Sequence, residues 1–308
     1  MIQTQNLLSL KSDWTFKRIF TKEGNEDLLI DFLESILNTK INKIELRNTE
    51  LLKDNEEQKK GILDIKAELN DNSIIDIELQ IQNQKDFIER DLFYLAKLYA
   101  EQFKEGENYL NAKKVIVINL LDFDICKRNT YHSIIHLKFE DYAKETYLDL
   151  YDEEQTTLTD KLEIHIIELT KFLRLKDFKN NALVDWLLLM SGEREMIEMA
   201  LSRKAKKIQK AVRQLEYLKQ DEKARAEYEA YDMAIRDEKS KLMYAEKKGI
   251  EYGKSIGKDE GQKEEKYTIA KKMIKLNIPL DIIIETTELT KEEIDKIRKE
   301  SDYKNTNN

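Results

Sequence analysis

Residues 61–82, with the sequence GILDIKAELNDNSIIDIELQIQ, decide the fold class of this protein. Apolar and polar residues alternate through 61–69 and again through 73–82, and three polar residues at 70–72 separate the two segments. Alternation of this kind is typical of a strand with one buried face, and a polar cluster between two such segments is typical of a turn. The stretch therefore predicts a β-hairpin.

The register of this hairpin follows from the positions of its apolar residues. The odd-numbered positions are apolar in both strands, so both odd sets must face the core. Directly opposed residues of an antiparallel pair share a face, and their numbers have a constant sum, which the turn at 70–72 sets. The even-numbered residues then form a polar face, on which the opposed pairs are Asp64–Glu78, Lys66–Asp76 and Ile62–Gln80.

Two carboxylates meet on this polar face. Directly opposed side chains have Cβ atoms about 4.5–5.5 Å apart, so Asp64 and Glu78 repel each other unless a cation or a proton lies between them. A hard cation such as Mg2+, which is held by one or two carboxylates plus waters, suits that geometry. The same pattern also fits an ordinary solvated face, in which Lys66 and Asp76 form a cross-strand ion pair.

The rest of the first half alternates helices and strands. Apolar residues at spacings of three and four predict helices over 86–103 and over 13–38, which the polar segment 22–25 could divide in two. Further strands are predicted at 44–52, 114–121, 131–139, 146–151 and 162–169. This order of elements predicts an α/β protein with a mixed central sheet flanked by helices.

The second half of the chain reads as helical almost to its end. We expect a core at 1–180, a charged helical arm at 181–245 and a small C-terminal helical unit at 246–308. The last of these resembles a helix-turn-helix in its short helices and tight connections. A dimerisation element is the alternative interpretation.

Charge is unevenly distributed along the chain. The formal net charge is −8, which by itself argues against a nucleic-acid partner. Residues 201–275, however, contain 21 Lys and Arg against 14 Asp and Glu, so this segment is basic and the remainder is strongly acidic. The basic segment is either a solvated helix or the part of the chain that attracts phosphates.

Several classes of protein are excluded by composition. The one cysteine excludes a disulfide framework and a Cys-cluster zinc site. No run of 18 apolar residues is present, and no secretory leader precedes the first helix, so we expect a cytoplasmic protein that does not span a membrane. With three histidines and no Gly-rich phosphate loop, any catalysis is expected to use carboxylates.

The hairpin resembles the core of the PD-(D/E)XK nucleases, in which an Asp on one strand precedes a (D/E)xK tripeptide on the next. More closely, the chain resembles the Rpn family of recombination-promoting nucleases, also described as putative transposases. The matching features are DWTFKRIF at 13–20, Leu63-Asp64-Ile65, Glu78-Leu79-Gln80, the helix pattern Arg90, Tyr94, Tyr99, Gln102, Gly106 and Tyr109, and in the tail the glycines every fourth residue from 249 to 261, Ile269-Ala270-Lys271 and TTELTKEEI at 286–294. Together they cover about 13–121 and 245–298.

This resemblance implies a restriction-endonuclease-like fold and metal-dependent hydrolysis of DNA phosphodiester bonds. It implies that the catalytic residues are Asp64, Glu78, Gln80 and Asp13, that Asp64 and Glu78 bind Mg2+ or Mn2+, and that Arg90 and Lys17 contact DNA. Gln80 would position a water molecule through its amide. A homodimer is expected, because cutting two strands commonly needs two sites.

The departures from the motif leave other readings open. Leu63 replaces the motif Pro, and Gln80 replaces the motif Lys, so a catalytically silent DNA-binding or interaction protein with the nuclease fold is the main alternative. A structural adaptor that oligomerises through its C-terminal helices is another. Asp13 could instead cap the first helix. Lys17 could pair with Asp13 one turn before it, or compensate for the missing Lys.

Overall fold

The computed structural model describes residues 7–48, 64–69, 71–81, 86–138 and 157–305. The strands are β1 (Ile44–Arg47), β2 (Ile65–Leu69), β3 (Ile74–Gln80), β4 (Val115–Leu121), β5 (His132–Lys138) and β6 (Thr157–Glu168). The helices are α1 (Asp13–Phe20), α2 (Glu26–Leu37), α3 (Phe87–Ala100), α4 (Leu169–Leu173), α5 (Ala182–Met190), α6 (Arg194–Ser202), α7 (Lys206–Gln220), α8 (Glu222–Lys275), α9 (Leu280–Thr287) and α10 (Lys291–Asn305), with a short 3-10 helix η1 at Tyr109–Asn111.

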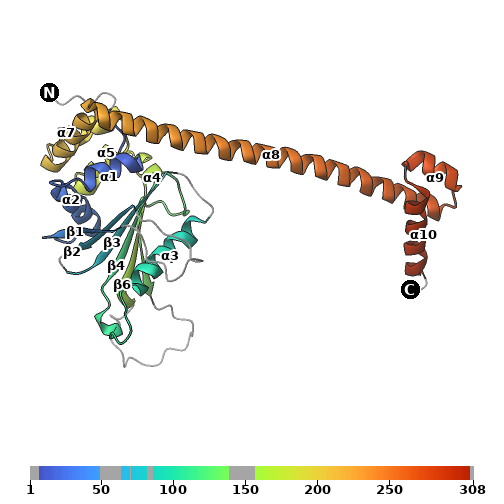
Figure 1. The fold of residues 1–308 in the computed structure, drawn as a ribbon, viewed down its shortest axis with the longest axis horizontal. Helices are drawn as coiled ribbons and strands as arrows, with labels where there is room; N and C mark the ends of the chain where they lie inside the picture. Colours follow the sequence, from blue (N-terminus) through green and yellow to red (C-terminus); the bar gives the residue numbers. More distant parts are fainter. Residues whose placement is uncertain (1–6, 49–63, 70, 82–85, 139–156, 306–308) are drawn as a thin grey trace. The chain divides into compact units, whose positions relative to one another are not determined.

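The six strands form one mixed sheet, as the sequence predicts. Their order is β1-β2-β3-β4-β6-β5. The pairs β1–β2, β2–β3 and β5–β6 are antiparallel, whereas β3–β4 and β4–β6 are parallel. Helices lie on both faces of the sheet (Figure 1), which confirms the predicted α/β class.

The predicted register of the β2–β3 hairpin is confirmed. The Cα partners include Ile65 with Ile77 and Lys66 with Asp76. The turn closes through Leu69, whose N–H donates to the Ser73 carbonyl at 2.9 Å. Ile62, the predicted partner of Gln80, lies outside the described residues.

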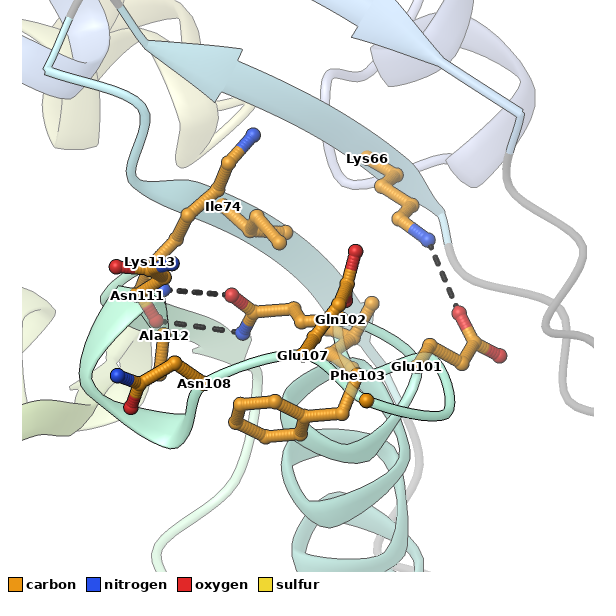
Figure 2. A pocket seen from close by; sticks show the side chains of 12 residues that line it. Lys66, Ile74, Glu101, Gln102, Phe103, Glu107, Asn108, Asn111, Ala112 and Lys113 are labelled. Atoms are coloured by element: carbon orange, nitrogen blue, oxygen red, sulfur yellow. Dashed lines mark hydrogen bonds and ion pairs between the residues drawn. The ribbon is translucent and has the colours of Figure 1, made fainter.

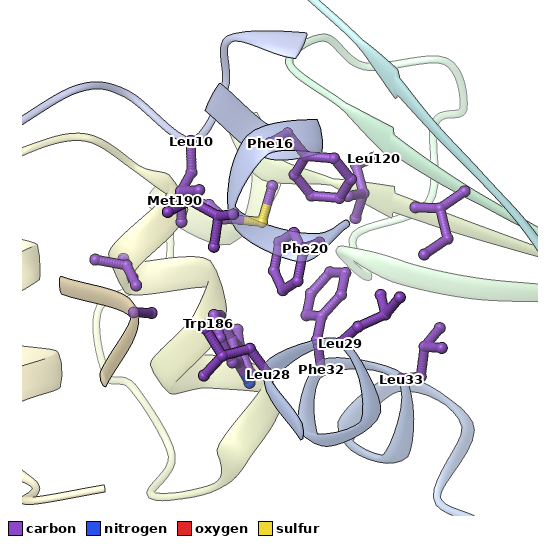
Figure 3. Close-up of a cluster of buried hydrophobic side chains, with 14 of the residues drawn as sticks. Leu10, Phe16, Phe20, Leu28, Leu29, Phe32, Leu33, Leu120, Trp186 and Met190 are labelled. Atoms are coloured by element: carbon purple, nitrogen blue, oxygen red, sulfur yellow. The ribbon is translucent and has the colours of Figure 1, made fainter. Parts of the chain in front are cut away.

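One face of the sheet carries the larger hydrophobic core. The odd-numbered hairpin residues pack there against α1, α2 and the helices from α5 to α7. Figure 3 shows the aromatic centre of this cluster, in which Phe20 and Phe32 stack and both contact Trp186. Burial of each such side chain stabilises the fold by roughly 1.5–3 kcal/mol. The Trp186 indole N–H also donates to Asp31 Oδ2 at 2.9 Å.

The opposite face is covered by α3. Phe87, Leu95 and Leu98 of this helix pack over the sheet, mainly against β4 and β6. The interpretation of the even-numbered hairpin residues as a solvated face is therefore wrong: Asp76 is fully buried and Glu78 is 5% exposed. The reason is topological. Parallel strands need a crossover connection, and α3 is the helix of the crossover between β3 and β4, so it covers the face that the hairpin pattern left open.

Several predicted elements differ from the structure in their limits. The helix predicted over 13–38 is divided into α1 and α2 by a turn in which Gly24 has φ +83°. The strand predicted at 162–169 begins earlier, at Thr157, and Leu169 already starts α4. The strand predicted at 146–151 lies outside the described residues.

The chain divides into two compact units, Met1–Glu229 and Ala230–Asn308. Within the first, buried side chains as far along as Leu218 and Ala224 belong to the larger core, so α5, α6 and α7 complete the α/β body. The second unit has a small core of its own, formed by Ala270, Ile283, Leu289, Ile294 and Ile297. Within the described ranges, no helix has both the length and the apolar character that a membrane crossing requires.

Candidate active site

The residues singled out in the sequence meet where β2 begins and β3 ends. A continuous set of polar contacts joins Asp13, Lys17, Asp64, Glu78, Gln80 and Arg90. They come from four elements, because Asp13 and Lys17 lie on α1, Asp64 directly precedes β2, the Glu78 and Gln80 side chains lie on β3, and Arg90 is on α3. The structure thus brings together all the candidate site residues.

Asp64 and Glu78 hold each other through the backbone. The Leu79 N–H donates to Asp64 Oδ2 at 2.8 Å, and the Asp64 N–H donates to Glu78 Oε1 at 3.2 Å. Each carboxylate is therefore oriented by a main-chain donor of the opposite strand. Backbone donors are fixed by the hairpin itself, so the two carboxylates are pre-positioned side by side.

The second oxygen of each carboxylate accepts from a side chain. Lys17 Nζ lies 3.0 Å from Asp64 Oδ1, and Gln80 Nε2 donates to Glu78 Oε2 at 3.2 Å. Lys17 Nζ also lies 3.0 Å from Asp13 Oδ1. The predicted pairing of Lys17 with Asp13 along the helix is confirmed, but Lys17 bridges two carboxylates and not one. The N-cap position of α1 belongs to Ser12, and Asp13 is the first helical residue.

Gln80 is held in one orientation by Arg90. Arg90 Nη2 donates to Gln80 Oε1 at 2.7 Å. A guanidinium can only donate, so Gln80 must present its carbonyl oxygen to Arg90 and its NH2 group to Glu78. The residue in the position of the motif Lys is therefore a positioned hydrogen-bond donor, and Arg90 fixes its direction.

The electrostatics of the site favour the uptake of positive charge. Burial, and next the charge of Asp64, raises the pKa of Glu78 to about 8. Burial and the charge of Asp64 also raise the pKa of Asp13. Burial lowers the pKa of Lys17, but the charges of Asp64 and Asp13 outweigh it and the net shift is upward. Closely spaced, buried carboxylates are stabilised by a proton or a cation.

Sequence reasoning missed a row of buried polar groups beside the site. Asp76 is fully buried, and among the described residues neither of its carboxylate oxygens has a hydrogen-bond partner. Burial raises its pKa well above the ordinary value. Asn119 of β4, the Cα partner of Glu78, donates from Nδ2 to Asp91 Oδ1 of α3 at 2.9 Å. Burial raises the pKa of Asp91 to about 6.

Two signals in the sequence could have pointed to this row. Asn119 is the one polar residue within the apolar strand VIVINLL at 115–121. Asp91 falls on the apolar stripe of α3, four residues after Phe87 and four before Leu95. A polar residue at an otherwise apolar, core-facing position requires a partner, and these two residues partner each other.

A separate pocket lies at the other end of the hairpin and of α3 (Figure 2). The Lys66–Glu101 ion pair, at 3.4 Å, lines it. Lys66 is thus paired with Glu101, which replaces the simple cross-strand pair with Asp76. Gln102 forms two hydrogen bonds with the backbone of Lys113 in the same pocket. The pocket contains none of the candidate catalytic residues.

The donor set of the site suits a hard divalent cation. Within the described part of the chain, no group of three or more His, Cys, Asp or Glu side chains is placed to hold a metal ion. Mg2+ does not need such a cage, because it is usually bound through one or two carboxylates and keeps several waters. Asp64 and Glu78 provide two adjacent carboxylates, and the Lys17 ammonium group lies 3.0 Å from Asp64 Oδ1.

The mixed sheet with helices on both faces is the fold of the PD-(D/E)XK class of nucleases. Residues 10–245 match a family model described as PD-(D/E)XK nuclease family transposase, so the chain belongs to that family. No curated protein matches the chain, and no solved structure does. Membership implies phosphodiester hydrolysis, a DNA substrate and a nuclease or transposition role. The match confirms the predicted resemblance to the PD-(D/E)XK nucleases and putative transposases.

Proposed function

We propose that this protein is a metal-dependent DNA endonuclease of the Rpn type, with Asp64 and Glu78 as its metal ligands. The observation that carries the proposal is the reciprocal pair of backbone hydrogen bonds between these two residues, at 2.8 and 3.2 Å. Ordinary surface acids avoid each other, whereas these two are locked together and shielded from solvent. Mg2+ is the expected metal, with Mn2+ as a substitute.

The other residues of the site have distinct roles. Asp64 and Glu78 would hold the metal, which when bound would polarise the phosphate as a Lewis acid and make a nearby water more acidic. The Gln80 amide donates hydrogen bonds and orients a water or a phosphate oxygen, since it carries no charge. Arg90 keeps Gln80 in this orientation, and its guanidinium is also the proposed contact for a DNA phosphate. Asp13 adds a carboxylate at the edge of the site.

The burial of Glu78 couples metal binding to proton release. Without a cation the Glu78 carboxyl is protonated at neutral pH, because its pKa is raised to about 8. A protonated carboxyl is a poor metal ligand, so Glu78 must release its proton when the metal binds. Metal binding at Glu78 and the loss of this proton are therefore linked.

DNA is the proposed partner, and two copies of the chain are proposed to act together. The basic segment at 201–275 supplies phosphate attraction that the acidic remainder lacks. We also propose that the protein serves recombination, transposition or defence against foreign DNA, and that it works in the cytoplasm. The C-terminal unit would contribute to DNA contact or dimerisation.

One observation favours a second function, that of a silent nuclease fold that binds DNA or another protein. The motif Lys is absent, and Gln80 is committed to Glu78 and Arg90. A protein of this kind would keep the carboxylate pair for structural reasons and would not cleave DNA.

Plasmid cleavage distinguishes the two functions. The full chain is incubated with supercoiled DNA in Mg2+ or Mn2+, beside EDTA and the variants Asp64→Ala and Glu78→Ala. We expect metal-dependent nicked or linear product that both variants lose. Folded protein that binds DNA but does not cut it would favour the silent fold. Cutting that survives both substitutions would place the active centre elsewhere.

A further inference from the structure

The four oxygens of the Asp64 and Glu78 carboxylates are held in two different ways. Asp64 Oδ2 and Glu78 Oε1 accept from backbone N–H groups of the hairpin. Those donors cannot leave without opening the sheet. Asp64 Oδ1 and Glu78 Oε2 accept from side chains, which can rotate away. The side-chain donors therefore mark the two oxygens that another ligand can reach.

Lys17 is the charged member of these two donors. Its Nζ lies 3.0 Å from Asp64 Oδ1 and 3.0 Å from Asp13 Oδ1. The helix that carries it is anchored by Phe16 and Phe20, which are 0% and 1% exposed. The Lys17 side chain itself is 34% exposed. A fixed helix with a partly solvated ammonium group gives Lys17 a defined base and a mobile end.

The position that the family motif assigns to Lys cannot supply positive charge here. Gln80 stands in that position, and an amide is uncharged. Lys17 approaches the same carboxylate pair from α1, on the Asp64 side, whereas Gln80 approaches from β3 on the Glu78 side. The positive charge of Lys17 and the amide donor of Gln80 thus come from two different elements, α1 and β3.

We propose that Lys17 takes over the role of the missing motif Lys and that its ammonium group holds the metal-facing oxygen of Asp64 in the metal-free protein. This inference rests on the proposed function. An ammonium group and a divalent cation on the same oxygen repel each other. Lys17 must therefore leave Asp64 Oδ1 before that oxygen can serve a metal, and the contact with Asp13 keeps it beside the site. There its N–H donors face the phosphate of a bound DNA strand.

The proposal makes two opposite predictions for the same substitution. Lys17→Met keeps the length of the side chain and removes the charge. We expect the Kd for Mn2+ to fall by about tenfold, because the competitor on Asp64 is gone. We expect the rate of plasmid cleavage at saturating metal to fall by about a hundredfold, because charge stabilisation of the phosphate is lost. If Lys17 had a purely structural role, Lys17→Met would weaken metal binding and also slow cleavage.

Matched variants isolate the effect of this one charge. Lys114→Met removes an ammonium of similar exposure, 29%, which pairs with Glu163 Oε2 at 2.8 Å just before β4 begins, at the end of that strand far from Gln80. This control variant should change neither the Kd for Mn2+ nor the rate of plasmid cleavage. Lys17→Arg keeps the charge and should keep weak metal binding and part of the cleavage. Lys17→Gln, which keeps a donor for Asp64, replaces Lys17→Met if the latter does not fold.

The measurements are isothermal titration with Mn2+ and plasmid cleavage on the full chain, with circular dichroism to confirm folding. Tighter metal binding together with slower cleavage supports the proposal. Unchanged or weaker metal binding overturns it, and so does unchanged cleavage. If the wild type neither binds metal nor cuts DNA, the proposed function fails first. If it does both and Asp64→Ala does neither, the function stands and the Lys17 variants alone decide.

Discussion

The two faces of the central hairpin are built from alternate residues of the same strands, yet they do different work. The odd-numbered face is wholly apolar, with Ile65, Ala67, Ile75 and Ile77 each at most 1% exposed. The even-numbered face is just as well covered near Asp76 and Glu78, but it buries carboxylates. Burial therefore stabilises the fold on the apolar face, whereas on the other face it raises the pKa values of the Asp76 and Glu78 carboxyl groups.

The largest effect should come from the apolar face. Phe20→Ala should lower the free energy of unfolding by about 3–5 kcal/mol, because it leaves a cavity between Phe16, Phe32 and Trp186. Urea denaturation measures it. A loss below about 1 kcal/mol would show that this face is loosely packed and would break the contrast between the two faces.

Asp76→Asn should raise the free energy of unfolding, whereas Phe20→Ala lowers it. The pKa of Asp76 in the folded state lies well above its ordinary value. Folding therefore costs free energy at any pH at which Asp76 is ionised in the unfolded chain. Stability should therefore decrease as pH rises above about 4, and Asn should remove that decrease. We expect the variant to be about 1–3 kcal/mol more stable at pH 7, with little difference at pH 3.

Asp27→Asn is the matched control for this change. Burial raises the pKa of Asp27, but hydrogen bonds from Lys207 and Lys210 outweigh it and lower the pKa overall. The stabilisation that Asp27 provides is present at neutral pH and disappears on acidification. Asp27→Asn should therefore lower the free energy of unfolding by about 1 kcal/mol or less at pH 7. If both variants changed the free energy of unfolding at pH 7 in the same direction, the explanation given for the buried Asp76 would be contradicted.

Metal affinity should increase with pH. Because the pKa of Glu78 is about 8, metal binding below that pH releases one proton. The apparent Kd for Mg2+ should fall by about tenfold per pH unit between pH 6 and 8 and level off above. Titration calorimetry in buffers of different ionisation enthalpy counts the protons. Binding without proton release would mean that Glu78 is already ionised.

The smallest effect should come from Arg90. Arg90→Ala leaves the two carboxylates in place but releases the Gln80 carbonyl, so the amide is no longer directed at Glu78. We expect the cleavage rate to fall several-fold while the Kd for metal stays unchanged. Gln80→Ala should then cost less in the Arg90→Ala background than in the wild type, since the two residues share a hydrogen bond. Fully additive losses would show that Arg90 does not act through Gln80.

The hairpin and its register were predictable because period-two alternation allows one register in which both apolar sets face the core. The register that sets Lys66 opposite Asp76 followed from that argument alone. The burial of the polar face was not predicted, because it depends on α3, which covers that face from a different part of the chain. The parallel pairing of β3 with β4 would have revealed it, but pairing between separate segments leaves no local pattern.

The site was predictable in part for the same reason. Asp64 and Glu78 lie on neighbouring strands, so a local pattern brings them together. Asp13 and Arg90 were found only through family resemblance, since contacts from α1 and α3 to the hairpin are long-range. The bridge from Lys17 to Asp64 was not foreseen, and the Asn119–Asp91 pair was missed because each residue looks like an isolated polar position in an apolar element.

The central claim is that Asp64 and Glu78 form a metal centre, and a Mn2+ titration of the full chain tests it most directly. Electron paramagnetic resonance of free Mn2+ measures the number of sites and the Kd at pH 8. We predict a site in the wild type that Asp64→Ala and Glu78→Ala both lose and that Asp27→Ala, at a partly exposed acid of α2, retains. Equal binding in all four proteins would contradict the claim.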